Sequence, residues 1–143
     1  MRIDPYLNFD GQCAEAFQLY ERVLGGRIDG MMTHGASPMA ADVPAAWRDR
    51  ILHARLVVGD QVLMGCDAPP EYYAKPQGAH VTITVKTAAE AERIFHGLAD
   101  KATVTMPIAT TFWSPRFGML TDRFGTPWMI TTESRPASAA SSR

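Results

Sequence analysis

The sequence predicts an α+β fold in which a β-α-β-β-β module occurs twice. Two observations carry this prediction. Strand-like and helix-like segments follow one another in the same order over residues 1–67 and 79–133. The two predicted helices also begin alike, with Cys13-Ala-Glu-Ala and with Ala88-Ala-Glu-Ala. We therefore predict a single domain over residues 1–135 and a frayed tail over 136–143.

Composition limits the class of protein. The 143 residues, 46% of them hydrophobic, suffice for one domain with its own core. The net charge of −1 provides no overall attraction for nucleic acid or an anionic membrane, so we expect neither as a partner. No apolar run approaches the ~18 residues of a spanning helix. The first ten residues lack a signal-peptide pattern, and two cysteines without a CxxC motif exclude a disulfide framework. A cytoplasmic protein is predicted.

The first module begins with an alternating strand over Ile3–Phe9, in which Leu7 and Phe9 share the apolar face. Asp10 can cap the helix that follows, and Gly25-Gly26 ends that helix. The remaining predicted segments are a helix at Cys13–Leu24, strands at Arg27–Thr33, Arg50–Val58 and Gln61–Cys66, a loop or short irregular helix at 35–46 and a linker at 67–78.

The second module repeats this order. Its first strand, His80–Val85, has one apolar and one polar face, and Thr87-Ala-Ala-Glu90 is a capping box for the next helix. Asp122-Arg-Phe-Gly125 suits a turn in which glycine takes a positive φ. The remaining predicted segments are a helix at Ala88–Asp100, strands at Thr103–Ile108, Phe117–Thr121 and Pro127–Thr132, and an aromatic-rich connection at 110–117.

Because each helix covers one face of its sheet, the other face is predicted to point into a concavity that binds a ligand. His53 on that face can act as a general base or serve as a hydrogen-bonded pocket wall. Arg55 can clamp a carboxylate or phosphonate, or form a cross-strand salt bridge or a rim contact. The other side chains predicted on these faces are Tyr6, Asn8, His80 and Thr82, and the loop residues that can close over a flat ligand are Trp113 and Phe117.

Four further side chains have a simpler interpretation. Cys13 lies on the apolar stripe of its helix and is predicted to be a buried, inert thiol. Cys66 alternates with Met64 and is expected in the core or in a pocket wall. His34 and His96 lack a positional argument for a site, and His96 is expected to be solvated on the polar side of its helix.

Several motifs carry a family resemblance. In the first module they are Pro5-Tyr-Leu-Asn-Phe, Ala14-Glu-Ala-Phe-Gln-Leu-Tyr20 and Leu24-Gly-Gly26. In the second they are Thr111-Phe-Trp113, Phe117-Gly118, Asp122-Arg-Phe-Gly125 and Trp128-Met-Ile. Over residues 3–133 the chain resembles the glyoxalase, bleomycin-resistance and extradiol-dioxygenase (vicinal oxygen chelate) superfamily, and its PhnB-like branch in particular. The resemblance implies sheets curled around a cavity, and a homodimer.

The resemblance also implies four metal ligands, usually His, Glu or Gln, from the first and last strands of the two modules. Carried over, the four positions fall on Asp4 or Pro5, near Met64 or Gly65, on His80 and on Met129. Hard divalent ions favour neither methionine nor glycine. We therefore expect no cofactor, with a divalent metal at His80 and Asp4 as the alternative.

By this carry-over His80 joins His53 as a predicted catalytic residue, unless it is a strand-start histidine bonded to the linker. Met129 joins the predicted ligand-binding residues. The leading hypothesis is a PhnB-like protein that binds a small, partly hydrophobic molecule. The alternatives are a metal-dependent lyase or isomerase of glyoxalase type and a drug-sequestering resistance protein. A methyltransferase is not expected, since no glycine-rich GxGxxG loop is present.

Overall fold

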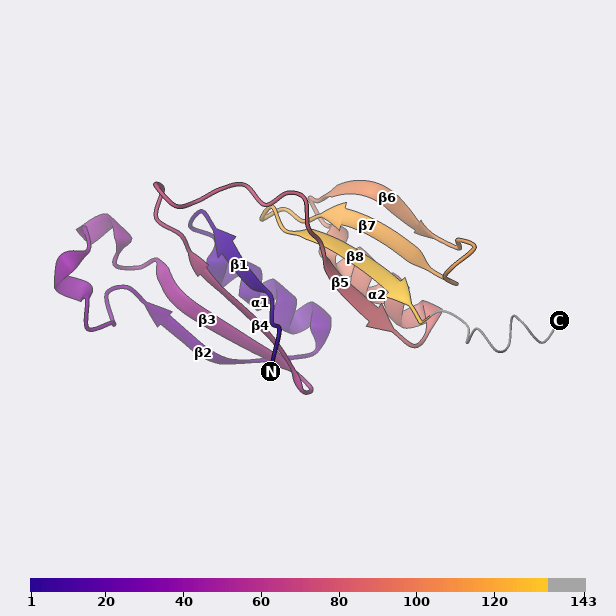
Figure 1. The fold of residues 1–143 in the computed structure, drawn as a ribbon, viewed down its shortest axis with the longest axis horizontal. Helices are drawn as coiled ribbons and strands as arrows, with labels where there is room; N and C mark the ends of the chain where they lie inside the picture. The colour runs from indigo at the N-terminus through magenta and orange to yellow at the C-terminus, as the bar shows by residue number, and fades with distance from the viewer. Residues whose placement is uncertain (134–143) are drawn as a thin grey trace. The chain divides into compact units, whose positions relative to one another are not determined.

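The computed structural model describes residues 1–133, so the tail predicted at 136–143 lies outside the described residues. The chain divides into two compact units, Met1–Pro76 (unit 1) and Gln77–Arg143 (unit 2), shown in Figure 1. Each unit contains one β-α-β-β-β module, which confirms the predicted α+β class. In the described part of the chain, no helix is both long and apolar enough to cross a membrane.

Unit 1 is a four-stranded mixed sheet with one helix on one face (Figure 1). The strand order is β1-β4-β3-β2, with β1 parallel to β4 and the other neighbours antiparallel. Its elements are β1 (Tyr6–Phe9), α1 (Cys13–Leu24), β2 (Arg27–Thr33), the 3-10 helices η1 (Ala40–Asp42) and η2 (Ala45–Trp47), β3 (Ile51–Val58) and β4 (Gln61–Asp67). The first strand begins at Tyr6 rather than at the predicted Ile3, because Pro5 has no N–H to donate to a ladder.

Unit 2 repeats this topology with the strand order β5-β8-β7-β6, and β5 is parallel to β8. Its elements are β5 (Val81–Val85), α2 (Ala88–Ala99), β6 (Thr103–Ala109), β7 (Phe117–Thr121) and β8 (Pro127–Thr132). His80 lies just before β5 rather than in it, and α2 ends one residue before the predicted Asp100.

Each helix lies on its sheet through an aromatic ring that contacts a glycine. A Cβ on Gly65 would lie 2.8 Å from Phe17 Cε1, and a Cβ on Gly118 would lie 2.7 Å from Phe95 Cε2. Only glycine allows the rings to approach the strands this closely. Trp128 is also buried, as predicted. We call the face of each sheet opposite its helix the open face.

The start of α1 is held by a residue far away in the sequence. The prediction that Asp10 caps this helix is wrong, since no side-chain cap bond is made there. Instead the buried carboxylate of Asp67, at the end of β4, accepts hydrogen bonds from three backbone N–H groups. These belong to Gly11 (2.9 Å), Cys13 (3.0 Å) and Ile51 (2.9 Å). Asp67 therefore satisfies donors at the helix N-terminus and ties them to β3 and β4.

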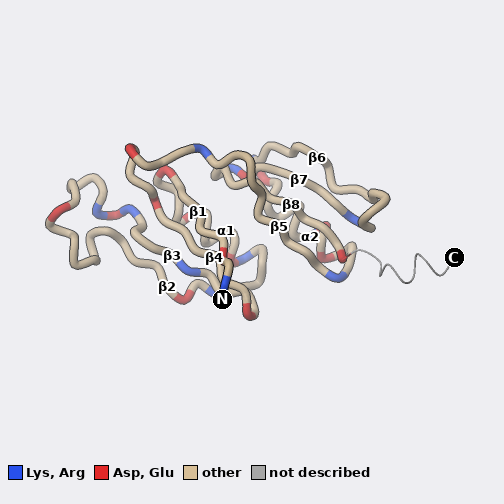
Figure 2. Tube along the Cα trace, viewed as in Figure 1, with Lys and Arg blue, Asp and Glu red and all other residues tan. Residues whose placement is uncertain are grey.

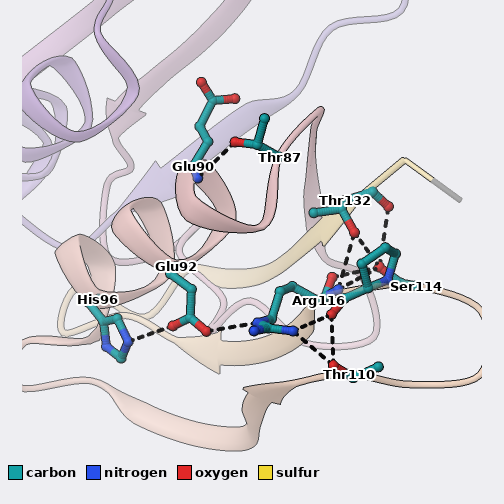
Figure 3. Close-up of polar contacts among 9 residues, drawn as sticks. Thr87, Glu90, Glu92, His96, Thr110, Ser114, Arg116 and Thr132 are labelled. Atoms are coloured by element: carbon teal, nitrogen blue, oxygen red, sulfur yellow. Dashed lines mark hydrogen bonds and ion pairs between the residues drawn. The ribbon is translucent and has the colours of Figure 1, made fainter.

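The start of α2 is held locally. Thr87 Oγ1 accepts a hydrogen bond from the backbone N–H of Glu90 at 3.1 Å, as the capping box predicts (Figure 3). The β7–β8 turn also follows its sequence, because Gly125 adopts a φ of 96°. Asp122, buried at the start of this turn, accepts a hydrogen bond from Trp128 Nε1 at 2.9 Å.

A polar network fastens the aromatic-rich connection between β6 and β7 (Figure 3). The buried Ser114 hydroxyl lies 2.6 Å from the carbonyl oxygen of Arg116 and 2.9 Å from Thr132 Oγ1. The Arg116 guanidinium donates to Glu92 of α2 at 3.0 Å and to Thr110 Oγ1 at 2.8 Å. Hydrogen bonds to β8 and α2 therefore hold this connection against the rest of unit 2.

Candidate functional site

Unit 1 presents two rows of side chains on its open face. Read across β1, β4, β3 and β2, the first row is Tyr6, Met64, Arg55 and Gly30. In the same order, the second row is Asn8, Cys66, His53 and Met32. Ala54 between these rows and Leu56 beyond the first row point to the helix side, and both are fully buried. His53 and Arg55 therefore lie on the face that alternation predicts, and their roles in ligand binding stay predictions.

Four of these groups form a contiguous cluster. The Tyr6 hydroxyl lies 3.3 Å from His53 Nδ1, and the Cys66 thiol donates to Asn8 Oδ1 at 3.5 Å. Burial raises the pKa of Tyr6 to about 12, so its phenol stays protonated at neutral pH. Burial also raises the pKa of Cys66, and a hydrogen bond with Tyr6 opposes that rise. The phenol and the thiol of this cluster are thus polar and uncharged at neutral pH.

Arg55 forms an ion pair with Asp29 of β2. The pair sits where the β2–β3 register shifts between Ile28 and Gly30, and the arginine side chain is 42% exposed. Of the alternatives that the sequence left open, the structure contains the cross-strand salt bridge. An anionic ligand would have to compete with Asp29 for this guanidinium.

Unit 2 has an open face of different chemistry. Read across β5, β8, β7 and β6, one row is Thr82, Met129, Met119 and Met106. The next row is Thr84, Thr131, Phe117 and Ala109. None of the four strands contains a charged residue, which leaves the sheet without blue or red in Figure 2. Three thioethers in line form a flexible, polarizable surface that adapts to apolar ligands.

An aromatic cluster stands at the end of this sheet. The ring centroids of Trp113 and Phe117 are 5.3 Å apart, and those of Phe112 and Trp113 are 4.7 Å apart. Phe112 is 97% exposed and Trp113 is 43% exposed. Edge-to-face packing holds the Trp113 ring in place while part of it remains open to solvent.

The strand register relates the positions to which the resemblance assigns metal ligands. Tyr6 pairs with Met64 as Thr82 pairs with Met129, so Asp4 and His80 stand at equivalent places, two residues before each pair. Of the carried-over alternatives, Asp4 and Met64 are the ones that the symmetry of the two modules matches with His80 and Met129, and their role as metal positions stays an expectation of the resemblance.

This donor set does not fit a hard divalent ion. Two of the four positions are thioethers, which such ions avoid. The Asp4 carboxylate is already paired with Arg2 at 3.0 Å, and His80 is exposed. Among the described residues of either unit, no three His, Cys, Asp or Glu side chains come together. A metal-activated reaction therefore has no support in these side chains.

The remaining singled-out residues lie away from the open faces. Cys13 is fully buried beneath the sheet and burial raises its pKa, as expected for an inert thiol. His96 is exposed and pairs with Glu92 at 3.0 Å. His34 is buried with its ring edge-to-face against Trp47, and its Nε2 has no hydrogen-bond partner among the described residues.

Sequence reasoning missed two parts of the open faces. It named Met129 but did not align Met106 and Met119 with it, and it did not find Asp29 as the partner of Arg55. Alternation already assigns Met119 to a face, but only the register between strands puts the three sulfur atoms in one row.

Comparisons with known proteins agree with this geometry. A family model described as Glyoxalase/Bleomycin resistance protein/Dioxygenase superfamily matches residues 2–130. Protein YjdN of Escherichia coli (strain K12) is 33% identical over 138 residues, which are 91% of this chain and 94% of that protein. Among solved structures, protein PA1353 from Pseudomonas aeruginosa is 46% identical with a TM-score of 0.86, covering 94% of this chain and 99% of that one. The PhnB protein from Bacillus cereus, 22% identical over 92% of this chain and 99% of that one, shares the fold with a TM-score of 0.77.

Proposed function

The chain belongs to the glyoxalase/bleomycin resistance/dioxygenase superfamily, as a PhnB-like and YjdN-like member, and we propose that it binds a small, partly hydrophobic molecule on its open faces. One observation carries the proposal. The open face of unit 2 aligns Met106, Met119 and Met129 on a sheet whose strands carry no charge. Covering such a surface with an apolar ligand is favourable, because apolar area is removed from water.

The open face of unit 1, taken by itself, offers polar contacts to a ligand. Tyr6, Asn8 and His53 present a hydroxyl, an amide and an imidazole within one cluster. Within unit 1 these polar groups share the sheet face with Met64, and they can orient a ligand while burial of its apolar part provides affinity. Arg55 adds a cation for an acidic ligand group, at the cost of its pair with Asp29.

The proposal is tested with a fluorescent amphipathic probe, 8-anilinonaphthalene-1-sulfonate. We expect the double variant Met119→Ser, Met129→Ser to bind the dye about tenfold more weakly, because it loses apolar contact area. The matched control is Met39→Ser, which removes a methionine that is 57% exposed but lies outside every strand. Equal losses in the control and the double variant, or no loss in either, would refute the proposal. Circular dichroism checks that the variants are folded.

The variant Arg55→Ala tests the polar contacts on the open face of unit 1. The guanidinium is partly exposed and already paired, so we expect an acidic ligand to lose about 0.5 kcal/mol of binding free energy, well below the value for a buried pair. His96→Ala is the control because His96 is exposed on α2. Isothermal titration with the same sulfonate dye measures both.

A second candidate function is sequestration of a flat drug without turnover, and the aromatic cluster favours it. Trp113 is held by Phe117 and keeps 43% of its surface exposed, which suits stacking on a planar ligand. Under this function Trp113→Ala lowers the affinity for an aromatic cationic drug such as bleomycin. Mass spectrometry then recovers the drug unchanged. Chemical conversion of the drug would instead support a lyase or isomerase.

The partner expected beside the ligand is a second copy of the chain. A homodimer has twice the chain mass of 15.7 kDa. Light scattering over a micromolar dilution series measures it, and a stable monomer throughout would exclude it.

A further inference from the structure

One end of the open face of unit 1 brings together three soft donor atoms, of which only the His53 imidazole also belongs to the proposed small-molecule site. Ala54 pairs with Gly65, and the antiparallel register therefore puts His53 opposite Cys66. His53 also pairs directly with Met32 of β2. Side chains at directly opposed positions on one face lie within contact range. A thiol, an imidazole and a thioether thus follow one another across β4, β3 and β2.

The structure points these donors away from the core. Ala54, the next residue of β3, is fully buried on the helix side, whereas Cys66 and His53 are half-buried and Met32 is 46% exposed. The thiol forms no disulfide, and Cys13 lies on the opposite side of the sheet. A metal ion can therefore reach the three donors from solvent.

Tyr6 is placed to orient the first two donors. Its hydroxyl lies 3.3 Å from His53 Nδ1 and also hydrogen-bonds Cys66. With the proton on Nδ1, the imidazole donates to the Tyr6 oxygen, and the lone pair on Nε2 is free for a metal. The Tyr6 O–H then donates to the Cys66 sulfur. Hydrogen bonds from a residue that does not itself bind the metal fix the tautomer and orientation of the metal ligands.

We propose that Cys66, His53 and Met32 form a binding site for a single Cu(I) ion. Thiolate, imidazole and thioether together are a donor set for a soft monovalent cation, and they exclude the hard divalent ions that prefer oxygen. On binding, the Cys66 S–H bond breaks, a sulfur–copper bond forms and one proton leaves to solvent. No electron is transferred, because copper enters and stays as Cu(I).

This site differs from the family's metal positions, which fall on other residues of this chain, Asp4, Met64, His80 and Met129. It shares His53 and Tyr6 with the polar part of the small-molecule proposal but does not rest on that proposal. The Met119 and Met129 variants test that proposal on another sheet, so failure of one proposal leaves the other unaffected.

The test is an anaerobic titration of the purified full chain with Cu(I) against the chromogenic chelator bicinchoninate. We expect one tightly held Cu(I) per chain. Cys66→Ser should weaken binding by more than about 100-fold, and loss of the orienting hydroxyl in Tyr6→Phe by about tenfold. Cys66→Ser retains Cys13, so it also shows whether the buried thiol contributes.

Two methionine variants provide the matched comparison. Met32→Leu should weaken Cu(I) binding, while Met39→Leu, which changes an exposed methionine outside the strands, should leave it unchanged. Metal-free melting curves check the fold, and His53→Gln replaces Cys66→Ser if the latter is unfolded. The proposal is overturned if the wild type does not compete with bicinchoninate. It is also overturned if the folded Cys66 or His53 variant binds Cu(I) like the wild type.

Discussion

The two units have the same topology and the same kind of packing between helix and sheet, but the side chains on their open faces differ. In both, an aromatic ring of the helix is seated on a strand glycine, Phe17 on Gly65 and Phe95 on Gly118. Both also bury a carboxylate that binds backbone N–H groups. The scaffold is thus built by similar contacts in each unit.

The open faces differ in chemistry. Unit 1 presents Tyr6, His53 and Cys66 with the Arg55–Asp29 pair, whereas unit 2 presents threonines and a row of methionines. Substitutions on a helix-facing side chain disturb the close-packed core, and we expect those on an open face to disturb it less. The comparison therefore separates residues that maintain the fold from residues free to recognise a ligand.

The largest expected effect comes from removing the carboxylate that holds α1. Asp67→Ala leaves three backbone N–H groups without their acceptor, and we expect a loss of about 3 kcal/mol in the free energy of unfolding. Urea denaturation measures it. A loss below about 1 kcal/mol would mean that water replaces the carboxylate at little cost.

The glycine under Phe17 gives the next largest effect. Gly65→Ala puts a Cβ 2.8 Å from the ring and from the Leu7 carbonyl oxygen, and we expect a loss of about 2 kcal/mol in unfolding free energy. Gly30→Ala is the control in the same sheet, because its Cβ meets nothing closer than 3.9 Å. Equal stability of the two variants would contradict the division between helix side and open side.

Removal of the local cap of α2 should lower the free energy of unfolding by a smaller amount. Thr87→Ala removes the bond to the Glu90 N–H, and we expect a loss of about 1 kcal/mol in thermal or urea unfolding. The equivalent change before α1, Asp10→Ala, should have almost no effect, since α1 has no side-chain cap. A comparable loss of unfolding free energy in Asp10→Ala would indicate that Asp10 does cap α1 in solution.

The two thiols distinguish the faces of one sheet without perturbing the fold. In the native protein, we expect a thiol reagent such as iodoacetamide to modify Cys66 at least about tenfold faster than the buried Cys13. The thiolate is the reactive form, and burial raises the pKa of Cys66 above that of an ordinary thiol, so its rate should still rise with pH where the rate of an ordinary thiol has levelled off. Peptide mapping identifies the modified cysteine, and preferential labelling of Cys13 would reverse the assignment of the faces.

Local sequence alone determined the elements and most of their faces. The helix Cys13–Leu24 and the strands Arg27–Thr33, Phe117–Thr121 and Pro127–Thr132 have the predicted bounds. Periodicity, end glycines and the Thr87 capping box are properties of neighbouring residues, so they can be identified without knowledge of the fold. The same alternation placed Tyr6, Asn8, His53 and Arg55 opposite the helix.

Tertiary structure decided which of these residues meet. Asp67 replaces Asp10 at α1, Asp29 pairs with Arg55, and Met119 joins Met106 and Met129 only through the pairing of strands. The sequence predicts no such partners, because a strand has the same alternation whatever its neighbour. Register comes from packing of the helix face across the whole sheet, and a slip of one residue would exchange the two faces.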